Sequence, residues 1–197
     1  MNSMHRGLVS AVIAGGLLCG ALGSGAEAAT KPAAAKPAAA AAAPAAAPAS
    51  AMAPTSIGTF KSWTAWTGKD ASGLTCYISA EPTASLPAGA KRDPIHFLIV
   101  DRKGLGTKNE VQTLIGYTFK KDSKPSAAID SKTYPMIADG SGAWLAAAAD
   151  EPGFVAALKK GTKLTVKGTS QRGTDTTDTY TLSGVTAAIA AIEKACS

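Results

Sequence analysis

The segment GLTCYISA, residues 73–80, carries the pattern from which the fold of this chain can be worked out. Leu74, Cys76 and Ile78 occupy every second position, and alternate residues of a β-strand point to opposite faces of a sheet. The segment therefore predicts a strand with one buried face, and it places Cys76 on that face.

Short segments of similar character follow one another along the chain, separated by turns rich in glycine and proline. The helical crossovers of a parallel, doubly wound sheet are missing between them. We therefore expect a mostly β fold, an antiparallel β-sandwich or barrel-like domain with one short helix and a C-terminal helix. Besides residues 73–80, the expected strands span residues 59–67, 95–101, 111–119, 127–130, 133–138, 143–146, 162–169 and 177–183.

Two helices are expected in the C-terminal part of the chain. The first lies between residues 151 and 160, where Asp150 can cap its N-terminus and Pro152 suits its first turn. Gly161 stands just beyond it, at a position where helices commonly end. The second helix is expected at residues 185–196.

The N-terminus has the features of an export signal. Arg6 precedes an apolar run at residues 8–22, and residues 26–28 place small side chains at the spacing that signal peptidase recognises. We therefore predict a signal peptide at residues 1–28, with no transmembrane span left after cleavage. A retained membrane anchor and a lipid anchor at Cys19 are the alternatives, although the apolar run is short for a span of about 20 residues.

Residues 29–55 contain 16 alanines and 5 prolines and no aromatic residue. Such a composition cannot bury a core, so we predict an Ala/Pro/Lys-rich disordered spacer. Residues 56–197 have the composition of an ordinary globular domain and are numerous enough to form a core. The chain is thus expected to consist of a signal peptide, a low-complexity linker and one folded domain.

Removal of the signal peptide leaves two cysteines, Cys76 and Cys196. In the C-terminal helix, Ile189, Ile192 and Cys196 share one face, so Cys196 lies on the stripe that packs against the domain. We therefore predict a disulfide bond between Cys76 and Cys196, which suits an oxidising compartment such as the periplasm. It would close a loop of about 120 residues, worth roughly 4 to 5 kcal/mol of stability. Two free buried thiols are the alternative.

Several short motifs follow one another in a characteristic order. They are CYISAEP (76–82), Lys91-Arg92, GYTF (116–119), GAW (142–144), LKKG (158–161), TSQRGTDTTDTYTLSG (169–184) and an Ala-rich helix that ends in Cys196. In this order and spacing, the chain resembles the invasion-associated locus B family of bacterial envelope proteins over residues 59–197. The resemblance implies a secreted or periplasmic β-rich domain without established enzymatic activity, linked in the namesake member to invasion of host cells and so to virulence. The long spacer departs from the family's pattern.

Few residues are candidates for catalysis. The mature chain has one histidine, His96, and no serine in a G-x-S-x-G motif, so the common catalytic triads lack parts. We interpret His96 as a strand histidine with a local hydrogen bond, a metal ligand or general base being the alternative. Asp175 and Asp178 could contact Ca²⁺, but turn and strand-cap roles are favoured because the segment lacks the acidic density of a calcium loop. We predict no catalytic, cofactor-binding or metal-binding residue, and no enzymatic activity.

The tryptophans are expected to serve mainly in packing. Trp63 and Trp66 stand three residues apart, so a regular strand directs them to opposite faces, one to the core and one to the rim. The exposed one could act as a ligand platform, and Trp144, which follows Gly142, is expected to pack. The glycine-rich segment at residues 104–108 matches no phosphate-binding loop and lies between two strands, so a hairpin loop is favoured.

The folded part carries 17 lysines and arginines against 13 aspartates and glutamates, a net charge of +4. The basic residues are spread along the chain, with local concentrations at residues 91–92, 101–103, 120–121 and 159–160. This excess is too mild to predict nucleic-acid binding, but it allows peripheral contact with anionic envelope polymers. A solvated basic surface without a specific role is the alternative.

These observations favour an exported, noncatalytic envelope or host-interaction protein, periplasmic or secreted, whose partner is an unidentified envelope or host-surface component. Two other functions stay open. One is a periplasmic hydrolase or enzyme regulator with a site around His96 and residues 175–178. The other is a structural protein that stabilises the envelope or cell wall, in which the spacer matters more than the domain surface.

Overall fold

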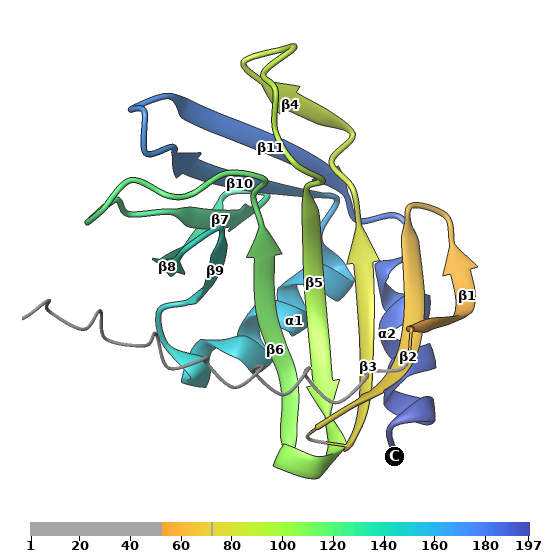
Figure 1. Ribbon diagram of the computed structural model, residues 1–197. Coiled ribbons are helices and arrows are strands. Elements are labelled where there is room, and N and C mark those ends of the chain that lie inside the picture. The colour runs from red at the N-terminus through yellow and green to blue at the C-terminus, as the bar shows by residue number, and fades with distance from the viewer. Residues whose placement is uncertain (1–52, 72) are drawn as a thin grey trace, which may run out of the picture. The chain divides into compact units, whose positions relative to one another are not determined.

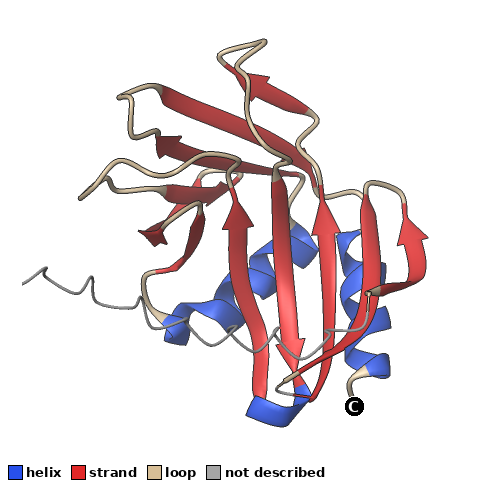
Figure 2. Cartoon of the chain, in the orientation of Figure 1, coloured by secondary structure: helices blue, strands red, loops and turns tan. Residues whose placement is uncertain are grey.

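The computed structural model describes residues 53–71 and 73–197 (Figures 1 and 2). The predicted signal peptide at residues 1–28 and the predicted spacer up to residue 52 lie outside the described residues. The described part forms eleven strands, two α-helices and two 3₁₀ turns. The strands are β1 (Thr55–Phe60), β2 (Trp63–Asp70), β3 (Gly73–Ala80), β4 (Ala84–Leu86), β5 (His96–Arg102), β6 (Thr107–Leu114), β7 (Ser126–Ile129), β8 (Lys132–Asp139), β9 (Gly142–Leu145), β10 (Lys163–Thr169) and β11 (Asp175–Thr181).

The described strands form one antiparallel sheet in the order β1-β2-β3-β5-β6-β9-β8-β7-β10-β11-β4. Figure 1 shows β3, β5 and β6 side by side, with β10 and β11 crossing beyond the ends of these strands. The sheet curls without closing, and β1 and β4 are its two edges. The expected fold class is therefore confirmed as a mostly β, antiparallel domain with one short helix and a C-terminal helix.

The two helices, α1 (Glu151–Lys160) and α2 (Val185–Ala195), lie against the sheet on the same side (Figure 2). Helix α2 contacts β1, β2, β3 and β5, and α1 contacts β6 and α2. Each helix directs an apolar stripe into the core, including Phe154 and Leu158 of α1 and Ile189 and Ile192 of α2. The predicted C-terminal helix is confirmed together with its buried face.

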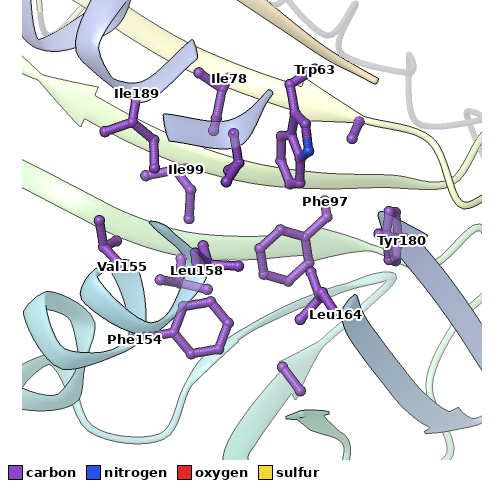
Figure 3. Packing of buried hydrophobic residues seen from close by; sticks show 14 of the residues in the cluster. Trp63, Ile78, Phe97, Ile99, Phe154, Val155, Leu158, Leu164, Tyr180 and Ile189 are labelled. Carbon is purple, nitrogen blue, oxygen red and sulfur yellow. The ribbon is translucent and has the colours of Figure 1, made fainter. Parts of the chain in front are cut away.

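Phe97 on β5 is central to an aromatic cluster in the core (Figure 3). Its ring centroid lies 6.4 Å from that of Trp63 on β2. The ring centroids of Phe154 on α1 and Tyr180 on β11 each lie 5.9 Å from it. Because these four residues come from four separate elements, the aromatic contacts connect both helical and sheet layers across one continuous core.

The single strand expected at residues 59–67 is wrong, because a turn divides this segment. Lys61 has a φ of 57°, and the chain reverses there so that Phe60 pairs with Trp63. The alternating pattern rich in threonine continues on both sides of the turn, so the sequence pattern does not reveal the turn. Strand β4 was not expected, since three residues are too few to show a period. The hairpin expected at residues 104–108 is present, but the connection between β5 and β6 spans residues 103–106 and contains the 3₁₀ turn η1 (Lys103–Leu105), whereas residues 107 and 108 already belong to β6.

Helix α1 has the predicted bounds, with Pro152 in its first turn as expected, but Asp150 and Gly161 act differently from the prediction. Asp150 lies in the 3₁₀ turn η2 (Ala148–Asp150), and its side chain makes no capping hydrogen bond, so the predicted cap is wrong. Gly161 has an ordinary φ of −80°, and a β-carbon there would lie 2.6 Å from Cγ2 of Ile129. Asp130 accepts hydrogen bonds from the N–H and the hydroxyl of Thr162 just after the helix. Tertiary packing, more than local helix-ending chemistry, requires the glycine.

Candidate functional site

The structure joins Cys76 on β3 to Cys196, the residue after α2, in a disulfide bond. The two Cα atoms are 6.1 Å apart, and 120 residues separate the cysteines in sequence. Cys76 is fully buried, beside Ile78 on the face that alternation predicted, and Cys196 is also buried. Thiols in solution have little access to either sulfur atom, so they do not readily reduce the bond. The bond is therefore suited to holding α2 on the sheet.

Asp101 on β5 lies directly across from Cys76 in the sheet. Its side chain is buried, and one carboxylate oxygen accepts a hydrogen bond from the N–H of Asn109 at 2.8 Å. Burial raises the pKa of the Asp101 carboxyl, while this hydrogen bond and the nearby Lys108 oppose the rise. We use "disulfide end" for Cys76, Cys196 and Asp101, where a covalent crosslink stands beside a buried carboxyl group.

A second long-range connection joins Arg92 to Asp178 on β11. Nη1 and Nη2 of Arg92 donate hydrogen bonds to the two carboxylate oxygens of Asp178 at 2.8 and 2.7 Å. The Arg92 side chain is only 6% exposed, and that of Asp178 is 0% exposed. A bidentate, charge-assisted pair fixes the plane of the guanidinium, and loss of either partner would leave a buried charge unpaired.

Both members of this ion pair have further partners. Nε and Nη2 of Arg92 donate to the carbonyl oxygen of Ile115, and the hydroxyl of Ser85 donates to Asp178 at 2.7 Å. The pair thus connects the loop before β5 with β4, β11 and the segment after β6. An arginine has five N–H groups, and these contacts use four of those on Arg92. The fifth, on Nη1, has no acceptor among the described residues.

Tyr117 lies against the Arg92 guanidinium, whose Cζ atom is 5.0 Å from the centroid of the tyrosine ring, a cation–π distance. The Tyr117 hydroxyl is 2.6 Å from Oγ1 of Thr176, and burial raises the pKa of this hydroxyl. Gly168 leaves room for the ring, since a β-carbon there would lie 2.8 Å from the Tyr117 hydroxyl. We use "ion-pair end" for Arg92, Asp178 and Tyr117, whose side chains hold one another in place.

A cavity of about 560 Å³ lies beside the ion-pair end, and we call it the cationic pocket. Three segments surround it: residues 90–92, residues 117–118 and the turn between β10 and β11. Its charged lining residues are all cations, and the others are mostly hydroxyl and amide side chains. The pocket is lined by Ala90, Lys91, Arg92, Tyr117, Thr118, Ser170, Gln171, Arg172, Thr174 and Thr176.

Backbone hydrogen bonds fix the walls of the cationic pocket. In the turn between β10 and β11, the N–H of Ser170 donates to the carbonyl of Thr174 at 2.9 Å. The N–H of Gln171 donates to the carbonyl of Thr118, also at 2.9 Å, which ties the turn to the neighbouring wall. Gly173 provides the left-handed conformation of the turn with a φ of 85°. Arg172 therefore projects from a turn whose backbone is held on two sides.

The structure does not bring His96 together with the aspartates of β11. His96 begins β5, and strand alternation places its side chain on the face opposite to that of the buried Phe97. Asp178 shares the inner face of β11 with Tyr180, whose ring contacts Phe97. His96 and Asp178 therefore lie on opposite faces of the sheet, and the site considered around them in the sequence does not assemble.

Residues 175–178 lie in strand β11 instead of a loop. Asp178 is paired with Arg92, so its interpretation as a turn or strand-cap residue is wrong. Asp175 begins the strand and accepts a hydrogen bond from the Thr169 hydroxyl at 2.7 Å, a local role of the expected kind. Within residues 53–71 and 73–197, no group of three histidine, cysteine, aspartate or glutamate side chains is placed to hold a metal ion. In the same part of the chain, no helix has both the length and the apolar character to cross a membrane.

The tryptophans take the two positions that their spacing predicted. Trp63 is fully buried in the core, whereas Trp66 is partly exposed on the other face of β2. The Trp66 ring stacks on Tyr77 with centroids 6.2 Å apart, and its Nε1 donates to the hydroxyl of Ser79 at 3.0 Å. Trp144 packs over the backbone of β9, where a β-carbon at position 142 would lie 2.7 Å from its ring. These contacts account for all three rings as packing residues.

Sequence reasoning missed Arg92 and Asp178 as partners, although one signal was present. Thr176, Asp178 and Tyr180 alternate along β11, and Tyr180 is buried, so Asp178 had to point inward as well. A carboxylate on a buried face requires a cation or several hydrogen bonds. Nothing in the pattern identified which of the 17 cations of the folded part would provide it.

Comparisons with known proteins give two matches. A family model described as "Invasion associated locus B (IalB) protein" matches residues 63–193. A solved structure, described as the crystal structure of invasion associated protein B from Bartonella henselae, is 12% identical, with a TM-score of 0.49 over 71% of this chain and 99% of that chain. No curated protein matches. The family match spans Cys76 and both members of the ion pair, and it ends before Cys196.

Proposed function

The chain belongs to the invasion associated locus B family, and from this we propose that it is an exported, noncatalytic envelope or host-interaction protein that contacts its partner through the cationic pocket. The observation that carries the proposal is the arrangement around Arg92. A buried ion pair and a hydrogen-bonded turn hold Lys91 and Arg172 at the rim of one cavity. A rigid site of this kind binds without first having to be ordered.

Export is supported by two features that are independent of the pocket. The N-terminus carries the predicted signal peptide at residues 1–28. The folded part contains a buried disulfide, which is typical of proteins that fold in an oxidising compartment. We therefore propose a periplasmic or secreted location.

A binding role is supported by the chemistry of the pocket lining. Tyr117 and Thr176 bond to each other, and Arg92 is committed to Asp178 and Ile115, so these groups act as a fixed floor. Apart from Ala90, the exposed lining residues carry cationic, hydroxyl or amide groups, which suit hydrogen bonding to a partner. His96 is not among them, and its side chain lies on the outer face of β5.

The proposal is tested by capture of partners from envelope extracts and from host-cell surfaces with the purified chain. Thr118→Trp fills the cationic pocket from an exposed position on its wall, and Thr133→Trp adds the same side chain at an exposed site on β8, away from it. We expect the wild type and Thr133→Trp to retain the same partner at raised salt, and Thr118→Trp to lose it. Equal capture by all three proteins would show that the contact surface lies elsewhere.

Location and catalysis have separate tests. Cell fractionation with N-terminal sequencing is expected to recover the chain outside the cytoplasm, cleaved before Ala29. An uncleaved chain in the cytoplasm would contradict export. His96→Ala is expected to leave partner capture unchanged, whereas a hydrolase that uses this imidazole would lose its cellular effect.

A further inference from the structure

We propose that the cationic pocket binds a sulfate, phosphate or carboxylate group of a polyanionic saccharide, held between Lys91 and Arg172. This inference rests on the proposed function, because it names the class of ligand for the same site. Ligands of this class have in common an oxyanion group that is attached to a saccharide with many hydroxyl groups. Both phosphorylated envelope saccharides and sulfated host-surface saccharides provide it.

The charge of the pocket selects for anions. The ion pairs of the described residues are Arg92–Asp178, Arg102–Glu110 and Lys159–Glu193, so Lys91 and Arg172 take part in none of them. Both side chains are exposed and line the pocket, and no carboxylate lines it. Two uncompensated cations at one cavity attract an anion more strongly than either alone.

Two other cavities among the described residues have mixed charge. The cavity lined by residues 119–124 and 136–140 includes three lysines, but Asp122 and Asp139 line it as well. The cavity beside the disulfide end includes Lys103 and Lys108 together with Asp101 and Glu193. The cationic pocket differs from both because no carboxylate lines it. Of the aspartates whose charge acts on Tyr117, Asp178 is paired with Arg92, and Asp175 accepts a hydrogen bond from Thr169.

Arg92 adds a rigidly held hydrogen-bond donor to this site. Its side chain is 6% exposed and lines the pocket, and its remaining Nη1 N–H has no acceptor among the described residues. An anionic oxygen in the pocket can accept a charge-assisted hydrogen bond from this N–H. The same guanidinium cannot move to meet a ligand, because Asp178 and Ile115 hold its other N–H groups.

The neutral lining residues favour a saccharide as the body that carries the anion. A cavity of about 560 Å³ is much larger than one oxyanion, so the ligand must fill the rest with groups that suit the walls. Thr118, Ser170, Gln171 and Thr174 present hydroxyl and amide groups that can pair with sugar hydroxyls. The exposed large apolar side chains, Ile57, Leu86, Leu105 and Ile137, all lie outside the pocket, which disfavours a lipid acyl chain.

The test is a binding titration of the purified chain with defined probes, followed by amide chemical shifts and by calorimetry. The probes are a sulfated heparin hexasaccharide, a phosphorylated core oligosaccharide released from lipopolysaccharide, neutral maltohexaose and inorganic phosphate. We expect at least one charged saccharide to bind and to shift the amides of Thr118, Gln171 and Arg172. Maltohexaose should bind at least about tenfold more weakly, because it lacks the group that the cations hold.

Two variants with the same change in charge separate the site from general attraction. The double variant Lys91→Gln with Arg172→Gln is expected to bind the charged saccharide about tenfold or more weakly than the wild type does. Lys69→Gln with Lys160→Gln removes two exposed charges elsewhere and should change the affinity by less than about threefold. All four side chains are exposed, so both variants should retain the wild-type circular dichroism spectrum.

The outcomes are distinct. Binding of only the sulfated probe assigns a host-type ligand, and binding of only the phosphorylated probe assigns an envelope ligand; both support the inference. Equal losses in the two variants, or binding of neither charged saccharide, would overturn it. If Thr118→Trp still abolishes partner capture in that case, the pocket remains the contact surface and only the ligand class is wrong.

Discussion

The disulfide end and the ion-pair end both connect residues far apart in sequence, but by opposite chemistry. Cys76 and Cys196 are joined covalently across 120 residues. Arg92 and Asp178 are 86 residues apart and are joined by charge and hydrogen bonds alone. The first holds α2 on the sheet, and the second holds a loop against β11 beside the cationic pocket.

The two connections act on different states of the chain. A disulfide restricts the unfolded chain, so it raises stability even though it makes few contacts in the folded protein. An ion pair exists only in the folded state, where the desolvation of both charges offsets much of their attraction. The disulfide end therefore serves mainly stability, and the ion-pair end serves mainly the orientation of the residues around the pocket.

Breaking the disulfide end has the largest expected effect. The double variant Cys76→Ala with Cys196→Ala should lower the free energy of unfolding by about 5 kcal/mol, since the bond closes a loop spanning 120 residues. Urea unfolding followed by tryptophan fluorescence measures the change. The wild type that is reduced in the unfolded state and refolded in reductant should unfold like the variant. Equal unfolding midpoints of the variant and the oxidised wild type would contradict the assignment.

Breaking the ion pair between Arg92 and Asp178 has the second-largest expected effect on stability. Asp178→Ala leaves the guanidinium of Arg92 buried without its carboxylate, and we expect a loss of about 3 to 5 kcal/mol in the same assay. Replacing both partners by apolar residues, Arg92→Met with Asp178→Leu, should recover most of this loss. As a control, Arg102→Ala removes the more exposed pair with Glu110 and should cost about 1 kcal/mol or less. A double variant as unstable as Asp178→Ala would refute the charge explanation.

A pair of glycine substitutions tests how closely the ion-pair end is packed. In Gly168→Ala the new methyl group would lie 2.7 Å from Phe119 and 2.8 Å from the Tyr117 hydroxyl, so we expect a loss of about 1 to 3 kcal/mol. Gly153→Ala in α1 meets no atom within 4 Å and should gain up to about 1 kcal/mol from helix propensity. Thermal unfolding followed by circular dichroism compares the two. A stabilising Gly168→Ala would show that Tyr117 is loosely held.

The smallest effect concerns pH at the disulfide end. Burial raises the pKa of Asp101, so its charged form opposes folding at neutral pH, and protonation relieves this as the pH falls through the raised pKa. Asp101→Asn keeps an acceptor for the N–H of Asn109 and should be more stable than the wild type at neutral pH. The difference should shrink at about pH 3, below the usual pKa of an aspartate. A difference in stability between Asp101→Asn and the wild type that grows as the pH falls would contradict this prediction.

Alternation and helical periodicity predicted much of the fold from local sequence. The segment at residues 73–80 and the stripe on the C-terminal helix are local patterns whose buried faces follow from strand and helix geometry alone. The cysteine pair could be predicted because two cysteines have only one way to pair. The turn at Lys61 escaped prediction because threonines on both sides of it continue one pattern.

The candidate site could not be predicted in the same way. Arg92, Tyr117 and Arg172 belong to three separate segments, and although each lies in a motif that carries the family resemblance, none of these motifs indicates a binding site. Gly161 and Gly168 likewise appear as ordinary glycines in the sequence, although neighbouring side chains leave no room for a β-carbon at either position. Contacts of this kind depend on which strands become neighbours, and the order of strands in the sheet is not a local property.

The sequence by itself determined the mostly β class, the buried faces of its strands and helices, the pairing of its cysteines and its resemblance to a family. Each of these depends on spacing along the chain or on a choice with few alternatives. Only the tertiary structure decided that Asp178 is buried against Arg92, that His96 lies on the other face of the sheet, and that Lys91 and Arg172 share a cavity. The physical reason is that one buried charge can be paired by any of many cations, and only the curling of the sheet brings one of them within hydrogen-bond distance.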